Sequence, residues 1–221
     1  MIKLSSIQKL MAAFIFFIAG MLVMRIAYAD NLHYVFLLWN LFLAWIPFQP
    51  ALLLTVTRQQ HRWHCWVLLP VWLLFFPNSL YIVTDLMHLE NINDRVPVWY
   101  DAVLLFTAAI AGLIMAYASL LQVERFFKKN ISAKHTEKLV VAVLFTGSFG
   151  VYIGRFLRWN SWDIITNPFS LLQEVAANLL MPFHHYRTWM VTLLLTCLFS
   201  LLYYAIKKLP ALLYEPGNYK R

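Results

Sequence analysis

Charged residues are scarce in this sequence of 221 residues. Only 18 are Lys or Arg and 10 are Asp or Glu, or 13% together, whereas 62% are apolar or aromatic. A soluble domain usually carries about 25% charged residues. So few charges cannot cover so large an apolar surface, which excludes a water-soluble monomer and a nucleic-acid-binding domain.

Cysteine is almost absent, and so are the common catalytic motifs. The two cysteines, Cys65 and Cys197, are too few for a disulfide-rich secreted scaffold. The high apolar content also excludes low-complexity disorder. The sequence has no glycine-rich nucleotide loop, nucleophile elbow, HExxH pair or haem-attachment motif. These absences leave a membrane protein whose chemistry no standard motif identifies.

The sequence is rich in uncharged runs of about 20 residues, the length that a helix needs to cross the hydrocarbon core. The runs are continuous, whereas the strands of a membrane barrel alternate apolar and polar residues. We therefore expect an all-α fold, a polytopic transmembrane helical bundle forming a single domain over 1–221. The six predicted spans lie near 10–29, 33–56, 65–84, 98–121, 138–158 and 188–206.

A shorter helix is predicted near 168–181. Asn167 and Pro168 fit an N-cap followed by proline at the first helical position. The run that follows is amphipathic but too short to span. We expect this helix to lie in the membrane interface.

The positive residues predict the orientation, because Lys and Arg close to spans are retained in the cytoplasm. With both termini inside, most of the 18 basic residues fall in cytoplasmic segments. The net charge of +8 is therefore a topology signal, and we expect no nucleic-acid partner.

The first span has two interpretations. Lys3 and Lys9 precede an apolar stretch ending at Ala29, which also fits a signal peptide cleaved after that residue. Arg25 interrupts the run, which is long for a signal peptide, so retention is favoured. Cleavage would leave five spans.

Uncharged polar residues lie inside the second and third spans, toward the outer leaflet. Asn40 and Asn78 are placed to line a polar pocket, and Pro77 beside Asn78 predicts a kinked or broken helix there. No ionisable residue lies in the middle of a predicted span, which argues against an ion-coupled transporter.

Acidic residues and a histidine follow the third span. Asp85 and His88 are three residues apart, and Asp101 begins the next span. Two carboxylates and an imidazole suit acid/base catalysis or a divalent metal, and Asp163 could join them. Helix capping or loop hydrogen bonds are the alternative, so the identity of any metal or other cofactor stays open.

The fifth span combines small residues with a cluster of polar ones. Gly147, Gly150 and Gly154 form a stripe that permits close helix packing, within the chain or against a membrane protein partner. Beyond the stripe, Arg155 and Arg158 are predicted to share a face and hold a lipid phosphate or headgroup. Asn160 and Trp162 lie beside them. Snorkelling arginines and an aromatic belt are the alternative.

Three strings together resemble an uncharacterised bacterial multi-pass membrane family, catalogued as domain of unknown function 1361. They are residues 75–89, from Phe75 to Leu89, then Trp99-Tyr100-Asp101, then residues 150–164, from Gly150 to Ile164. The similarity covers about residues 35–205. It implies a bacterial polytopic protein of the cytoplasmic membrane and no particular reaction.

The sequence thus favours an outward-facing polar site that binds or processes a lipid or a lipid-linked phosphate. A non-enzymatic membrane partner or assembly factor is one alternative, and a small-solute transporter is another. Whether the protein is an enzyme is left open.

Overall fold

The structure is a computed structural model that describes residues 6–56, 62–89, 96–129, 131–159 and 163–213. In these ranges the chain forms helices and no strand. The elements in chain order are α1 (Ser6–Ala29), α2 (Phe36–Trp45), α3 (Phe48–Val56), α4 (Arg62–Tyr81), the 3-10 helix η1 (Ile82–Leu89), α5 (Val98–Lys128), α6 (Ala133–Phe156), α7 (Asp163–Thr166), α8 (Pro168–Leu180) and α9 (Tyr186–Leu213).

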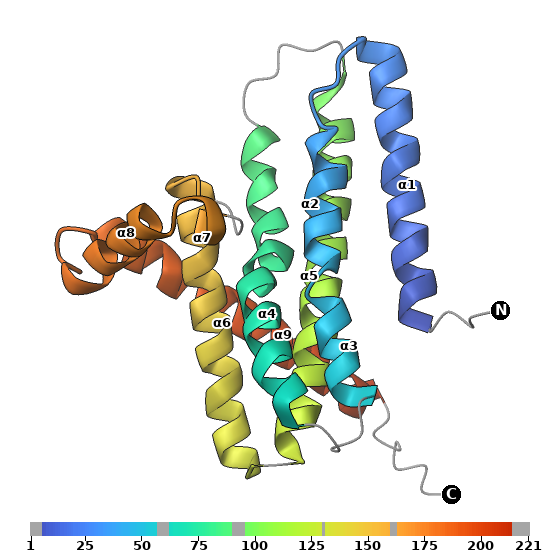
Figure 1. The fold of residues 1–221 in the computed structure, drawn as a ribbon. Coiled ribbons are helices and arrows are strands. Elements are labelled where there is room, and N and C mark those ends of the chain that lie inside the picture. Colours follow the sequence, from blue (N-terminus) through green and yellow to red (C-terminus); the bar gives the residue numbers. More distant parts are fainter. Residues whose placement is uncertain (1–5, 57–61, 90–95, 130, 160–162, 214–221) are drawn as a thin grey trace, which may run out of the picture.

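Within the described residues, six helical segments are long and apolar enough to cross a membrane. They correspond to the six predicted spans, which confirms the all-α transmembrane class. The chain is therefore a multi-pass membrane protein. We call the end where α1 and α6 finish the Asp85 end, and the opposite end, where α5 and α9 finish, the Glu124 end (Figure 1).

Two of the spans are irregular, and prolines explain part of this. The second span is divided into α2 and α3 beside Pro47, which has no amide hydrogen to continue the helix. In contrast, α4 continues through Pro70 and Pro77 to Tyr81. The helix narrows to η1 only after Tyr81, four residues beyond the kink predicted at Pro77. That change turns the residues of η1 toward neighbouring helices.

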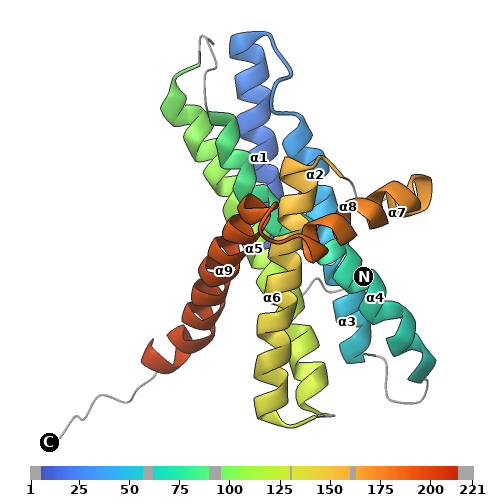
Figure 2. The ribbon, with the colours of Figure 1, turned by 90° about the vertical axis from the view of Figure 1, so that its left-hand side faces the viewer.

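The long helix α5 is the centre of the bundle and the most buried of the six spans. One apolar core lies between α5 and α3, α4, α6 and α9, and a second lies between α5 and α1 and α2. The last helix packs mainly on α6. Figure 2 shows α9 diverging from the other spans, and the rest of the chain leaves most of its surface exposed.

The predicted interfacial helix is α8. It begins at Pro168 after the N-cap residue Asn167, and α7 and α8 project from the side of the bundle (Figure 1). The buried amide of Asn178 joins α8 to α9: Thr188 Oγ1 donates to Asn178 Oδ1 at 2.6 Å, and Trp189 Nε1 donates to the Asn178 backbone carbonyl at 3.1 Å. These two bonds hold α8 against the start of α9.

Candidate functional site

A cavity of about 510 Å³ lies between α2, α4 and α6, with α7 and α8 at its edge. Its wall is mostly apolar, as expected inside a membrane bundle. Within the described part of the chain, four polar side chains line it, each from one of the three spans. They are Asn40, Asn78, Tyr81 and Thr146. Asn40 and Asn78 are the two residues that the sequence predicts for a polar pocket.

A buried ion pair adjoins this cavity and involves two of its lining residues. Arg155 Nη1 lies 3.2 Å from Asp85 Oδ1 and also donates to Tyr81 Oη at 3.1 Å. Arg155 Nη2 donates to the Thr84 carbonyl at 3.0 Å, and the guanidinium carbon is 5.4 Å from the centre of the Tyr81 ring. Asn40 Nδ2 donates to Asp85 Oδ2 at 2.8 Å. One carboxylate thus links α2, η1 and α6.

The ion pair fixes the orientation of Asn40. The Asp85 side chain has no exposed surface, and that of Arg155 is 12% exposed. A carboxylate only accepts hydrogen bonds, so the amide nitrogen of Asn40 must face Asp85. Its carbonyl oxygen is then directed away from Asp85 and remains a hydrogen-bond acceptor beside the cavity. The polar groups that face the cavity are therefore neutral, and the charges of Asp85 and Arg155 neutralise each other beside it.

Asp101 belongs to a different ion pair. Arg25 Nε lies 2.7 Å from Asp101 Oδ1, and Arg25 Nη2 donates to Asp101 Oδ2 at 3.1 Å. Arg25 Nη1 donates to Asn31 Oδ1 at 2.6 Å, and the guanidinium carbon lies 4.5 Å from the Tyr34 ring centre. The two carboxylates that the sequence groups together therefore have separate cationic partners.

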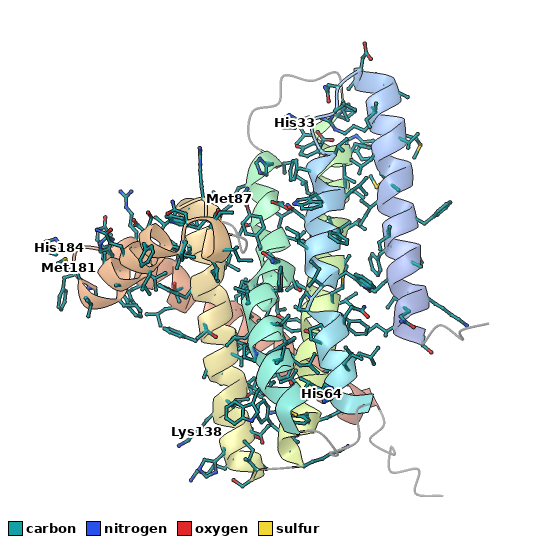
Figure 3. All side chains as sticks on the ribbon, in the orientation of Figure 1. His33, His64, Met87, Lys138, Met181 and His184 are labelled. Carbon is teal, nitrogen blue, oxygen red and sulfur yellow. The ribbon has the colours of Figure 1, made fainter. Side chains whose placement is uncertain are left out.

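His88 and Asp163 occupy other surroundings. The His88 ring packs against Phe36, with centroids 4.9 Å apart, and its backbone carbonyl accepts a bond from Tyr34. Asp163 accepts a bond from Thr166 at 3.1 Å. His184 lies at the tip of the α7–α8 arm, whereas His33 and Met87 lie toward the Asp85 end (Figure 3). Among the described residues no three His, Cys, Asp or Glu side chains form a group that could hold a metal.

The two arginines predicted to share a face diverge, because α6 ends at Phe156. Arg155 turns inward, whereas Arg158 is exposed and has a positive φ of 61°. The Trp159 amide bonds to the Ile153 carbonyl, six residues back, which closes the helix end around Arg158. Glycine usually takes this backbone position, since a side chain costs about 1 kcal/mol there. Asn160 and Trp162 lie outside the described residues.

The glycines of the predicted stripe lie in α6, and two of them pack against α4 of the same chain. A Cβ at Gly150 would lie 2.7 Å from Pro77 Cγ, and one at Gly147 would lie 3.0 Å from Phe76 and Leu80 side-chain atoms. Gly154 has more room, with its nearest neighbours at 3.5 Å or beyond. The first two glycines therefore let α6 approach α4. This internal contact removes the reason for assigning them to a separate membrane partner.

Sequence reasoning missed three residues of these networks. Arg25 carried a signal, because it interrupts the first apolar run, but its partner Asp101 is 76 positions away. Tyr81 and Trp159, both in the cavity wall, resembled ordinary interfacial aromatics. Nothing in the local sequence distinguishes them.

A comparison with protein families matches residues 39–202 to the family described as "Protein of unknown function (DUF1361)". That range covers most of the chain. The protein belongs to the DUF1361 family. The DUF1361 region contains every residue that lines the cavity, together with Asp85 and Arg155, but it excludes α1 and Arg25. No curated protein and no solved structure matched the chain.

Proposed function

We propose that this protein binds an amphiphilic lipid or a lipid-linked molecule in the cavity between α2, α4 and α6. The observation that carries the proposal is the lining of the cavity, which is largely apolar with a few fixed polar groups. Ligand sites generally have this composition, because apolar walls supply affinity and polar groups set orientation. The acyl or prenyl part would lie against Leu43, Leu73 and Leu74.

The polar part of the ligand would meet the amides of Asn40 and Asn78. Asp85 and Arg155 act behind them as positioning residues, since their mutual bonds hold Asn40 and Tyr81 in place. The Asp85 carboxylate is enclosed and accepts bonds from two side chains. This arrangement supports binding, and we assign no chemical step to it.

A phosphate on the ligand would interact with Arg158. Arg155 already donates to Asp85, Tyr81 and Thr84, whereas Arg158 is exposed directly before Trp159 in the cavity wall. Guanidinium groups bind phosphate through paired donors. We place this site on the outer side of a bacterial cytoplasmic membrane, in line with the distribution of basic residues.

Cavity filling tests the proposal with two matched variants. Leu73 lines the cavity and is 40% exposed, whereas Leu198 on α9 is 42% exposed and does not line it. Leu73→Trp should reduce the lipid that copurifies with the protein about tenfold, and Leu198→Trp should leave it unchanged. Lipids would be extracted from equal amounts of folded protein and quantified by mass spectrometry. Equal retention by both variants would refute the cavity as the binding site.

The phosphate contact needs a separate comparison. Arg158→Gln should weaken crosslinking of a photoactivatable lipid phosphate and leave that of the matching neutral lipid unchanged. Arg187→Gln, another exposed arginine, serves as the control. An equal effect of both substitutions, or an equal loss of both lipids, would contradict the role of Arg158.

A further inference from the structure

A second cavity, of about 500 Å³, lies at the Glu124 end between α1, α3 and α5. It is separate from the site proposed above, with no lining residue in common. One side of it is apolar, and the other carries positive charge. Its lining residues are Ile7, Phe48, Leu52, Leu54, Gln122, Arg125, Phe126, Lys128 and Lys129.

The charge in this cavity is all of one sign. Among the residues that the structure describes, Arg125, Lys128 and Lys129 line it, and no carboxylate does. The nearby Glu124 side chain is only 3% exposed and is bonded to Lys207 and Tyr203 of α9. Lys128 also reaches Glu124, at 3.2 Å. Arg125 and Lys129 therefore provide positive charge that this acidic group does not compensate.

The polar residues follow one face of α5. Gln122, Arg125 and Lys129 are spaced at i, i+3 and i+7, which places them along one side of the helix. The Oε1 atom of Gln122 is buried and has no hydrogen-bond partner among the described residues. Buried polar atoms are nearly always bonded. Since the last torsion of glutamine is broad, this amide can turn toward a donor in the cavity.

The opposite wall suits a hydrocarbon chain. Phe48, Leu52 and Leu54 of α3 supply apolar surface, and Ile7 of α1 closes the side. An acyl chain beside a cluster of cations is the arrangement of a phospholipid at the membrane boundary. α1, α3 and α5 all belong to segments long and apolar enough to cross a membrane, so we expect lipid of the surrounding bilayer to reach the cavity.

We propose that this cavity binds an anionic phospholipid whose headgroup carries a hydrogen-bond donor. The phosphate contacts Arg125 and Lys129, a headgroup hydroxyl donates to Gln122, and one acyl chain lies along α3. The ligand is a lipid of the surrounding membrane, and it joins α1, α3 and α5 at the end where α5 finishes.

The charge is tested on the full chain in detergent by native mass spectrometry with phosphatidylglycerol and phosphatidylcholine. Arg125→Gln with Lys129→Gln should weaken phosphatidylglycerol binding about 30-fold, since each basic residue near an anionic membrane contributes about fivefold and the two factors multiply. Lys134→Gln with Lys138→Gln is the matched control. It removes the same charge from exposed residues of α6 that do not line the cavity.

Retained binding by the control, with loss by the cavity variant, would support the site. An equal loss in both would assign the effect to diffuse electrostatics, and equal binding of phosphatidylcholine by the native protein would remove the requirement for charge. Either result overturns the proposal.

The hydroxyl contact is tested with phosphatidylmethanol, which is anionic but has no donor in its headgroup. The native protein should prefer phosphatidylglycerol to it, and Gln122→Leu should abolish this preference while leaving the charge intact. A preference that survives in Gln122→Leu would refute the role of Gln122. Lipid retention in the cavity of α2, α4 and α6 should be the same in all these variants.

Discussion

At the scale of single residues, the buried ion pair of Arg25 and Asp101 makes the stability of the protein sensitive to the loss of either side chain. Both side chains are at most 5% exposed, and their bonds join α1 to α5. Removing one member of such a pair leaves an uncompensated charge, which costs about 3 to 5 kcal/mol. Replacing both by apolar residues of similar size is much less harmful.

We expect Arg25→Met and Asp101→Leu each to destabilise the protein by about 3 to 5 kcal/mol. The double variant should lose far less than the sum of the two. Unfolding in detergent, analysed as a double-mutant cycle, measures both values. Additive losses would show that the two side chains do not depend on each other.

The sequence identified Asp85 and Arg155 as notable residues, but it did not predict that they pair with each other. Asp85 and Arg155 were both singled out from the sequence, as metal ligand or base and as phosphate ligand. Their contact with each other depends on how α6 packs against η1, because the two residues are 70 positions apart in the sequence. Local spacing favours partners within one helical turn, so it grouped Asp85 with His88 and Arg155 with Arg158.

At the scale of elements, the contact of α4 with α6 sets the shape of the first cavity. Gly150 and Pro77 approach each other in its wall, so the residues that bring the helices together also line the site. A side chain at Gly150 would clash with the Pro77 ring, which is rigid and cannot move aside.

Gly150→Ala should destabilise the protein by about 1 to 3 kcal/mol through overpacking. Gly20→Ala in α1 is the control, since nothing lies within 4 Å of the added carbon, and it should be neutral or slightly stabilising. Thermal unfolding of both variants in the same detergent provides the comparison. A Gly150→Ala protein as stable as the Gly20→Ala protein would refute the close contact.

The elements themselves were largely predictable. Apolar length identifies every span, and the Asn167-Pro168 pair marks the start of α8. The termination of α4 at Tyr81 was not predictable, because proline chemistry points to Pro77 instead. The surrounding helices hold the chain helical through Pro77, and this tertiary effect has no local signature.

At the scale of the whole molecule, two buried ion pairs lie toward the Asp85 end, and the basic residues Arg125, Lys128 and Lys129 lie at the Glu124 end. Leu32 and Phe183 are exposed, in segments that follow α1 and α8, and Lys134 is exposed near the start of α6. The segment that follows α1 lies at the opposite end of the bundle from the start of α6, whereas α8 projects from the side of the bundle (Figure 1).

Cysteine labelling in intact cells tests this arrangement and its orientation. In a background with Cys65→Ser and Cys197→Ser, we expect an impermeant maleimide to label Leu32→Cys and Phe183→Cys. Lys134→Cys should react only after permeabilisation, because basic segments stay in the cytoplasm. Labelling of Lys134→Cys in intact cells would reverse the proposed orientation.

The ion pair of Arg25 and Asp101 joins α1, which lies outside the matched family region, to α5, which lies inside it. Residues 39–202 contain Asp101 but not Arg25. A fragment trimmed to that region would therefore bury the Asp101 carboxylate without its cationic partner. Cleavage after Ala29 would have the same consequence. We therefore expect the first helix to remain with the mature protein, because its Arg25 supplies the counterion of Asp101.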